Sequence, residues 1–212
     1  KIDKLVIVAD RGLNSKENLL KLKELGLDFV IAQKVKNCPE TFRESILNNE
    51  NWENFLYTHD GEITAKYKTL NAQRTIYKNE ISEKTGKAYH TAEVFDVIPV
   101  RWVVTYSSSR AHQDLADLDR AEEKAREAIT KGYANNSGHE YKGLIKTPKG
   151  LGKPELDTEK LKEARTWAGY YAICTNIESL SNEEIVKIYW QLWRIEDCFR
   201  ISKTTLETRP CY

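Results

Sequence analysis

Hydrophobic residues near the start of the chain form two short runs separated by a segment of helical periodicity. The apolar run Leu5–Ala9 predicts a strand that is buried on both faces, and Asp28–Val35 predicts a second one. The intervening residues, from about Ser15 to Leu25, predict a helix, and Asn14 lies three residues before Glu17 as in a capping pair. A strand, a helix and a strand with short links predict parallel neighbouring strands and an α/β fold.

The middle of the chain has a different pattern. Periodicity fades from about residue 38 to 79, and within this range the stretches "NNENWENF" and "THDGEI" predict loops and turns. Residues Glu80–Ser109 alternate and are rich in Val, Trp and Tyr, so they predict hairpin-like β structure. Beyond them we expect a polar helix over Ser109–Lys131, a short helix over Asp157–Arg165 and a strand over Gly169–Thr175.

The last predicted helix begins at Ser181, where Ser181 and Glu184 have the spacing of a capping box. Its apolar residues are spaced three and four apart, which places them on one face of a helix. These residues are Ile185, Ile188, Leu192, Ile195 and Phe199.

A second line of side chains borders this apolar face. Tyr189, Glu196 and Lys203 are seven residues apart. Seven residues turn a helix by about 700°, so the three side chains lie nearly in line, roughly 10 Å apart. A carboxylate at Glu196 is thereby placed between core and solvent, where it can reach a ligand. Alternatively, Glu196 simply pairs with Arg200 four residues on, and Asp10 simply ends a strand and begins a turn.

Composition narrows the classes of protein. The chain is 40% hydrophobic and 31% charged, which is typical of a soluble globular protein. No run approaches the roughly 20 apolar residues that cross a bilayer, and the first residues lack the features of a signal peptide. The net charge is only +1, so a nucleic-acid site would have to be a local basic patch.

Cysteine and histidine offer no predicted metal centre. The four cysteines form no CxxC pair, so a zinc site or a disulfide framework is not expected, and a reducing cytoplasm is the default. The four histidines are expected to be surface or structural residues.

The chain begins at Lys1 and contains no methionine, and we expect it to be a fragment or a processed form of a longer protein.

Both ends of the chain resemble one family. The segments "LVIVADRGLNSKENLLKLKELGLDFVIAQKV" and "YWQLWRIEDCFRISKTTLETRP" are similar to the second-aspartate and final segments of bacterial insertion-sequence transposases of the DDE class. The final segment in that family carries the motif Y-x2-R-x3-E-x6-K. Tyr189, Glu196 and Lys203 fit it, whereas Leu192 stands where the family has Arg. The stretches "GYYAICTN" and "YSSSRAHQD" also resemble the branch with a long insertion.

The resemblance implies a fold and a division of the chain. The implied fold is α/β, a partial ribonuclease-H-like core with a β-rich insertion. Residues 1–37 would form the core strand–helix–strand, residues 38–168 the insertion with its helix near 109–131, and residues 169–212 the final strand and closing helix. The family also has an earlier catalytic aspartate, for which this sequence has no match.

The resemblance further implies catalytic residues and cofactors. Asp10 matches the second catalytic aspartate and Glu196 the catalytic glutamate, and both would be metal ligands. Two Mg²⁺ or Mn²⁺ ions are expected in the complete protein. Mg²⁺ prefers hard carboxylate oxygens, which explains acids in these positions instead of His or Cys. Because only two of the three acids are present, we expect these 212 residues alone to be inactive.

DNA contacts are expected around the same helix. By resemblance, Tyr189 and Lys203 would hold phosphates near the transposon end. Arg11, Arg194 and Arg200 could extend the patch, and the alternative for each arginine is a solvated surface charge. The partners implied are double-stranded DNA and a second copy of the chain in a synaptic homodimer, in the bacterial cytoplasm and without a membrane.

Two other functions stay open. A nuclease or resolvase of the same fold would use the same acids without joining strands. A non-catalytic DNA-binding remnant would agree with Leu192 in place of the motif Arg and with the unmatched first aspartate.

Overall fold

The computed structural model describes residues 5–54, 58–59, 62–63, 65–81, 88–132, 140–147, 152–192, 198 and 201. These residues belong to two compact units. The first unit is drawn from Lys1–Glu53, Tyr67–Val104 and Tyr171–Tyr212, and the second from Asn54–Lys66 and Thr105–Tyr170. The predicted division into residues 1–37, 38–168 and 169–212 separates a core from an insertion, which is a different question from which residues form compact units. That division stays a prediction.

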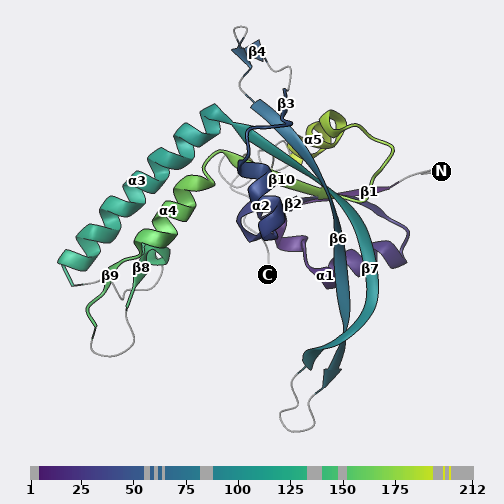
Figure 1. Cartoon of the computed structure of the whole chain (residues 1–212), viewed down its shortest axis with the longest axis horizontal. Coiled ribbons are helices and arrows are strands. Elements are labelled where there is room, and N and C mark those ends of the chain that lie inside the picture. Colours follow the sequence, from purple (N-terminus) through teal and green to yellow (C-terminus); the bar gives the residue numbers. More distant parts are fainter. Residues whose placement is uncertain are drawn as a thin grey trace. The chain divides into compact units, whose positions relative to one another are not determined.

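A mixed sheet of six strands organises the first unit (Figure 1). In spatial order its strands are β1 (Val6–Ala9), β2 (Asp28–Gln33), β10 (Tyr170–Thr175), β7 (Ala88–Ser107), β6 (Ala65–Ile81) and β3 (Glu53–Asn54). Strands β1 and β2 are parallel, as predicted, with Val6 opposite Asp28 and Ala9 opposite Ile31. Strand β10 is antiparallel to β2. The predicted α/β class is therefore confirmed at the level of a mixed α/β protein.

The first crossover is built by local signals in the sequence. A 3₁₀ turn, η1 (Arg11–Leu13), follows β1, and helix α1 (Lys16–Glu24) follows that turn. The capping pair expected at Asn14 is wrong: Ser15 is the N-cap and accepts a hydrogen bond from the Asn18 amide, because the Asn14 side chain is engaged elsewhere. The helix ends where Gly26 adopts a φ of +64°, which favours glycine.

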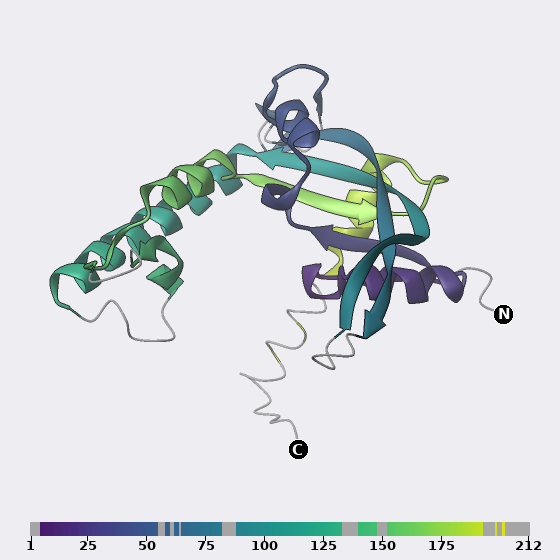
Figure 2. The ribbon, with the colours of Figure 1, turned by 60° about the horizontal axis from the view of Figure 1, so that its bottom comes forward.

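Strand β2 is the centre of the core. Four consecutive residues, Phe29 to Ala32, are buried, so both faces of the strand are covered. Helices α1 and α2 (Glu40–Leu47) each bury one side chain almost fully, and α5 (Asn182–Trp190) buries two. Figure 2 shows α1 and α2 on opposite sides of the strands. The ring of Phe42 on α2 contacts Trp102 of β7 edge-on, with centroids 5.6 Å apart.

Regular structure also occurs where the periodicity of the sequence fades, because α2 and most of β6 lie within residues 38–79. Lys68 explains part of the missing pattern. Its side chain is buried in β6, and its ammonium donates to the backbone carbonyls of Ser45 and Asn48 at the end of α2, at 2.5 and 3.2 Å. A charged residue therefore occupies a position where sequence patterns expect an apolar one.

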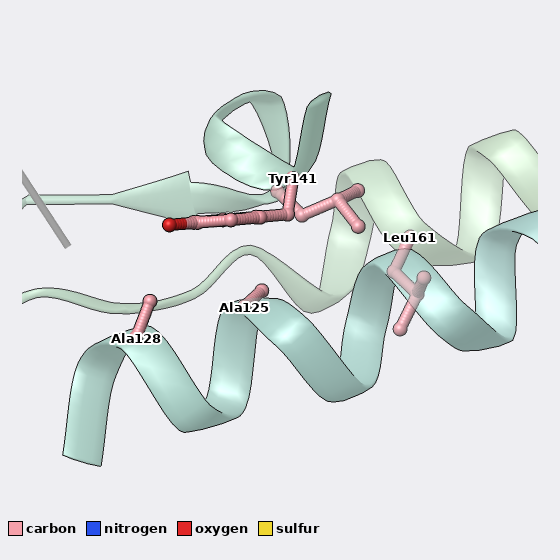
Figure 3. Packing of buried hydrophobic residues seen from close by; sticks show 5 residues of the cluster. Ala125, Ala128, Tyr141 and Leu161 are labelled. Carbon is pink, nitrogen blue, oxygen red and sulfur yellow. The ribbon is translucent and has the colours of Figure 1, made fainter. Parts of the chain in front are cut away.

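The second unit is mainly helical. Helix α3 (Ser108–Thr130) and helix α4 (Thr158–Thr166) match the two predicted helices closely. They pack with the 3₁₀ turn η3 (Glu140–Leu144) around a small apolar cluster (Figure 3). The buried residues of this cluster are Ala125, Ala128, Tyr141, Leu144 and Leu161.

Short strand pairs complete the second unit. Strands β4 (Thr58–His59) and β5 (Glu62–Ile63) form one antiparallel pair, and β8 (Ile145–Lys146) and β9 (Glu155–Leu156) form another. Gly169, between α4 and β10, has a φ of +81°. A Cβ added there would lie 2.6 Å from the Cβ of Ala111, so only glycine fits at this position. Among the helices that the structure describes, none has the length and apolar character needed to cross a membrane.

Candidate functional site

The first candidate site lies where the parallel strands β1 and β2 end. Asp10 directly follows β1, and its side chain is exposed. One carboxylate oxygen, Oδ1, accepts a hydrogen bond from the Gly12 amide at 2.8 Å and so caps the η1 turn. No described residue donates to the other oxygen, Oδ2. The carboxyl edge of an α/β sheet is where ligand sites commonly occur, and Asp10 presents a carboxylate with one unoccupied oxygen there.

The turn that carries Asp10 is fixed to the neighbouring strand by Asn14. The Asn14 amide nitrogen Nδ2 donates to the Ala32 carbonyl at 2.8 Å and to Gln33 Oε1 at 2.9 Å. The backbone of Asn14 also closes the turn by donating to the Arg11 carbonyl. Since Ala32 and Gln33 are the last residues of β2, the turn is held at the end of the sheet and cannot swing freely.

Arg74 of β6 completes this polar cluster. Its Nη2 donates to Gln33 Oε1 and lies 3.5 Å from Asn14 Oδ1, while its guanidinium lies 5.4 Å from the centre of the Trp102 ring. Its Nε is buried and has no acceptor among the described residues. Arg74 was not predicted as a site residue, because it lies where the periodicity of the sequence fades and no motif marks it.

Two of the predicted DNA-binding residues are described. Arg11 is exposed and begins the η1 turn directly after Asp10. Tyr189 on α5 shares a hydrogen bond with the Tyr171 hydroxyl of β10, and the two rings are 5.5 Å apart. Glu196, Arg194, Arg200 and Lys203 lie outside the described residues, so the convergence of Glu196 with Asp10 stays a prediction.

The described residues contain no group of three His, Cys, Asp or Glu side chains that could hold a metal ion. Asp10 alone offers a hard carboxylate ligand of the kind that Mg²⁺ prefers. The described cysteines, Cys38, Cys174 and Cys198, are free thiols. Burial raises the pKa of the Cys174 thiol to about 11, although nearby Arg74 acts to lower it. Cys174 is thus a structural residue of the core and not a reactive one.

A second candidate site is a cleft of about 820 Å³ within the first unit. It lies beside the first residues of β2, at the opposite end of the strand from Asp10. Asn176, which lines it, accepts a hydrogen bond from the Phe29 amide at 2.8 Å and donates to Asp28 at 3.3 Å. The remaining lining residues come from α2, β6, β7 and the segment after β10: Pro39, Phe42, Asn71, Ala72, Gln73, Pro99, Val100, Arg101, Thr175, Ile177 and Glu178. No pattern in the sequence marks this cleft.

In comparisons with known proteins, no family model matches the chain and no curated protein matches it significantly.

Proposed function

We propose that the chain is part of the catalytic region of a DDE transposase that cuts and rejoins DNA strands at the ends of a bacterial insertion sequence. The observation that carries the proposal is the place of Asp10. It stands at the carboxyl end of a buried parallel strand, exposed, with one carboxylate oxygen unengaged. That is where the resemblance to the second-aspartate segment requires a metal ligand.

The proposed core is ribonuclease-H-like. Support comes from the parallel pair β1 and β2 with α1 between them, and from α5, which begins at a capping box and buries Ile185 against the same sheet. Support also comes from the antiparallel strand β10, which precedes the closing helix as the family order requires.

Asp10 and Glu196 would hold divalent ions, Mg²⁺ or Mn²⁺, together with an acid that this sequence does not contain. Such ions supply an activated oxygen nucleophile and neutralise charge on the phosphate when bound. The role of this chain's own residues is to hold the first carboxylate in place, and the contacts of Asn14 with Ala32 and Gln33 support that role.

Tyr189, Lys203, Arg11, Arg194 and Arg200 would contact DNA phosphates. The pairing of Tyr189 with Tyr171 is compatible with this, since in a hydroxyl–hydroxyl pair the accepting oxygen keeps its own proton to donate onward. We further propose a homodimer on double-stranded DNA in the cytoplasm. The alternative of a hydrolytic nuclease or resolvase differs only in the absence of strand joining.

The test uses the full-length gene product and pre-cut DNA carrying the ends that flank its gene. Asp10→Asn and Glu196→Gln should each lower the rate of strand transfer by at least ~100-fold, which corresponds to about 3 kcal/mol of transition-state stabilisation. The matched control is Asp117→Asn, an exposed aspartate of α3 in the second unit, which should leave the rate unchanged.

The outcomes separate the alternatives. Hydrolysis without joining favours the nuclease, and DNA binding without either reaction favours the non-catalytic remnant. A metal readout is independent of activity: Fe²⁺ with ascorbate should cleave the polypeptide near Asp10 in the parent protein but not in Asp10→Asn. Unchanged strand transfer in both acid variants would refute the proposal.

A further inference from the structure

The cleft at the start of β2 contains an arginine whose charge no described carboxylate neutralises. Arg101 of β7 donates from Nη2 to the carbonyls of Ile177 and Leu180, at 2.8 and 2.7 Å. Its Nη1 has no acceptor in the part of the chain that the structure describes and remains for a ligand, whereas Nε, which also lacks an acceptor, is itself buried. A half-buried guanidinium with fewer acceptors than donors is costly and favours an incoming anion.

Two amide side chains beside Arg101 are available to a ligand. Asn71 and Gln73 lie two residues apart on β6, so they project from the same face of the strand. Both are exposed, and neither side chain has a hydrogen-bond partner among the described residues. Primary amides offer both donors and an acceptor, which matches the amide groups of a peptide.

The remaining walls of the cleft are apolar or structural. Pro39, Phe42 and Pro99 supply apolar surface. Thr175 and Asn176 are already bonded to the backbone of Phe29, so they shape the cleft and are not available for binding. A cleft of about 820 Å³ has the size of ordinary small-molecule sites.

Charge selects the class of ligand. Arg101 is the positive residue that lines the cleft and Glu178 the negative one, so the lining is neutral as a whole. A polyanion such as DNA gains nothing from a neutral site. A single carboxylate needs only Arg101 as its charged partner, and it brings less negative charge near the exposed Glu178 than a polyanion does.

We propose that this cleft binds an acyl amino acid or a peptide C-terminus, with the carboxylate on Arg101, the adjoining amide on Asn71 and Gln73, and an apolar side chain on Phe42. This site is separate from the Asp10 edge, and the proposal does not depend on the proposed transposase function. The shared chemistry is a carboxylate next to an amide, whether in a free metabolite or at the end of a chain.

The test is calorimetric titration of the purified chain with N-acetyl-leucine, its methyl ester, the peptide acetyl-Ala-Ala-Leu and inorganic phosphate. The free acid should bind at least about tenfold more tightly than the ester, because the ester cannot pair with Arg101. Phosphate should bind more weakly than either acid. Tighter binding of the peptide assigns the site to chain ends, and tighter binding of N-acetyl-leucine assigns it to small acids.

Variants locate the site. Gln73→Leu on the exposed strand face should weaken binding of the acid at least about threefold, and Arg101→Lys should weaken it about tenfold or more, because Lys keeps the charge but loses the planar fork. Gln113→Leu, on an exposed position of α3, is the matched control and should not change binding, nor should Asp10→Asn. Equal binding of acid and ester, stronger binding of phosphate, or no binding of either acid would overturn the proposal.

Discussion

The two ends of strand β2 are each tied to a neighbouring segment by an asparagine, but the ties differ in kind. At the amino end, Asn176 accepts from the Phe29 amide and Thr175 donates to the Phe29 carbonyl at 2.7 Å. At the carboxyl end, Asn14 donates to the Ala32 carbonyl and to the side chain of Gln33. The hydrogen bonds at the amino end satisfy both backbone groups of the fully buried Phe29. Those at the carboxyl end hold the turn that carries the exposed Asp10.

The arginines repeat this contrast. Arg101, near the amino end, donates to two backbone carbonyls, whereas Arg74, near the carboxyl end, donates to the side-chain oxygen of Gln33. Backbone acceptors are fixed by the fold, while side-chain acceptors can rearrange. We infer that the amino end stabilises the sheet and that the carboxyl end mainly positions Asp10.

The largest expected effect concerns the thiol between the two ends. Cys174 lies opposite Ile31 in the register of β10 and β2. With a pKa of about 11, roughly one thiol in a thousand is ionised at pH 8, compared with about one in ten for a cysteine with the ordinary pKa of about 9. Cys174 should therefore react with a disulfide reagent at least ~100-fold more slowly than the exposed Cys198 at pH 8, as measured by stopped-flow absorbance and peptide mapping.

Urea provides the control, since both thiols should react at similar rates in the unfolded chain. The same pKa shift predicts a pH dependence. The folded state keeps the proton that the unfolded state loses, so the Cys174 contribution to stability is constant below pH 9 and falls as pH rises from about 9 to 11. Native-state reactivity of Cys174 within tenfold of Cys198 would mean that one end of β2 opens readily.

The asparagines test the contrast directly. Asn176→Ala leaves the buried Phe29 amide without an acceptor, and we expect it to lower the free energy of unfolding by about 2 kcal/mol. Asn14→Ala leaves a carbonyl at the strand end short of a donor and should cost about 1 kcal/mol. Urea denaturation followed by tryptophan fluorescence measures both.

Asn18→Ala is a suitable control. Its side chain donates to the Leu13 carbonyl at an exposed position, and its loss should cost less than either of the other two changes. Equal losses for Asn176→Ala and Asn14→Ala would show that both ends support the fold alike, and a larger loss for Asn14→Ala would reverse the comparison.

Sequence alone predicted the elements whose signals are local. The strands and helix around residues 5–33, the long helix now seen as α3, and the capping box at Ser181 all follow from periodicity and end signals. Strand β6 was missed because its stability comes from pairing across the sheet and from Lys68 bonded to α2, neither of which leaves a periodic pattern.

The candidate sites show the same limit. Asp10 was found because it ends an apolar run and matches a family segment. Asn14, Gln33 and Arg74 come together only through the fold, since 41 residues separate Gln33 from Arg74. Arg101 is likewise 76 and 79 residues from its acceptors Ile177 and Leu180 in the sequence. The cleft that they border therefore cannot be recognised from sequence spacing.

The smallest expected effect on stability belongs to Arg74→Met. The variant keeps an unbranched apolar side chain near Trp102 but loses the hydrogen bond to Gln33 and the buried charge. Losing the hydrogen bond destabilises the fold, whereas removing a buried charge stabilises it. We therefore expect the free energy of unfolding to change by no more than about 1 kcal/mol. The informative readout is Cys174: removing the nearby guanidinium should raise its pKa further and slow its modification at pH 9 to 10. Arg120→Met, in an exposed ion pair on α3, should change neither. If Arg74→Met destabilises the protein more than Asn176→Ala does, the carboxyl end is a structural support of the sheet and not merely the place where Asp10 is held.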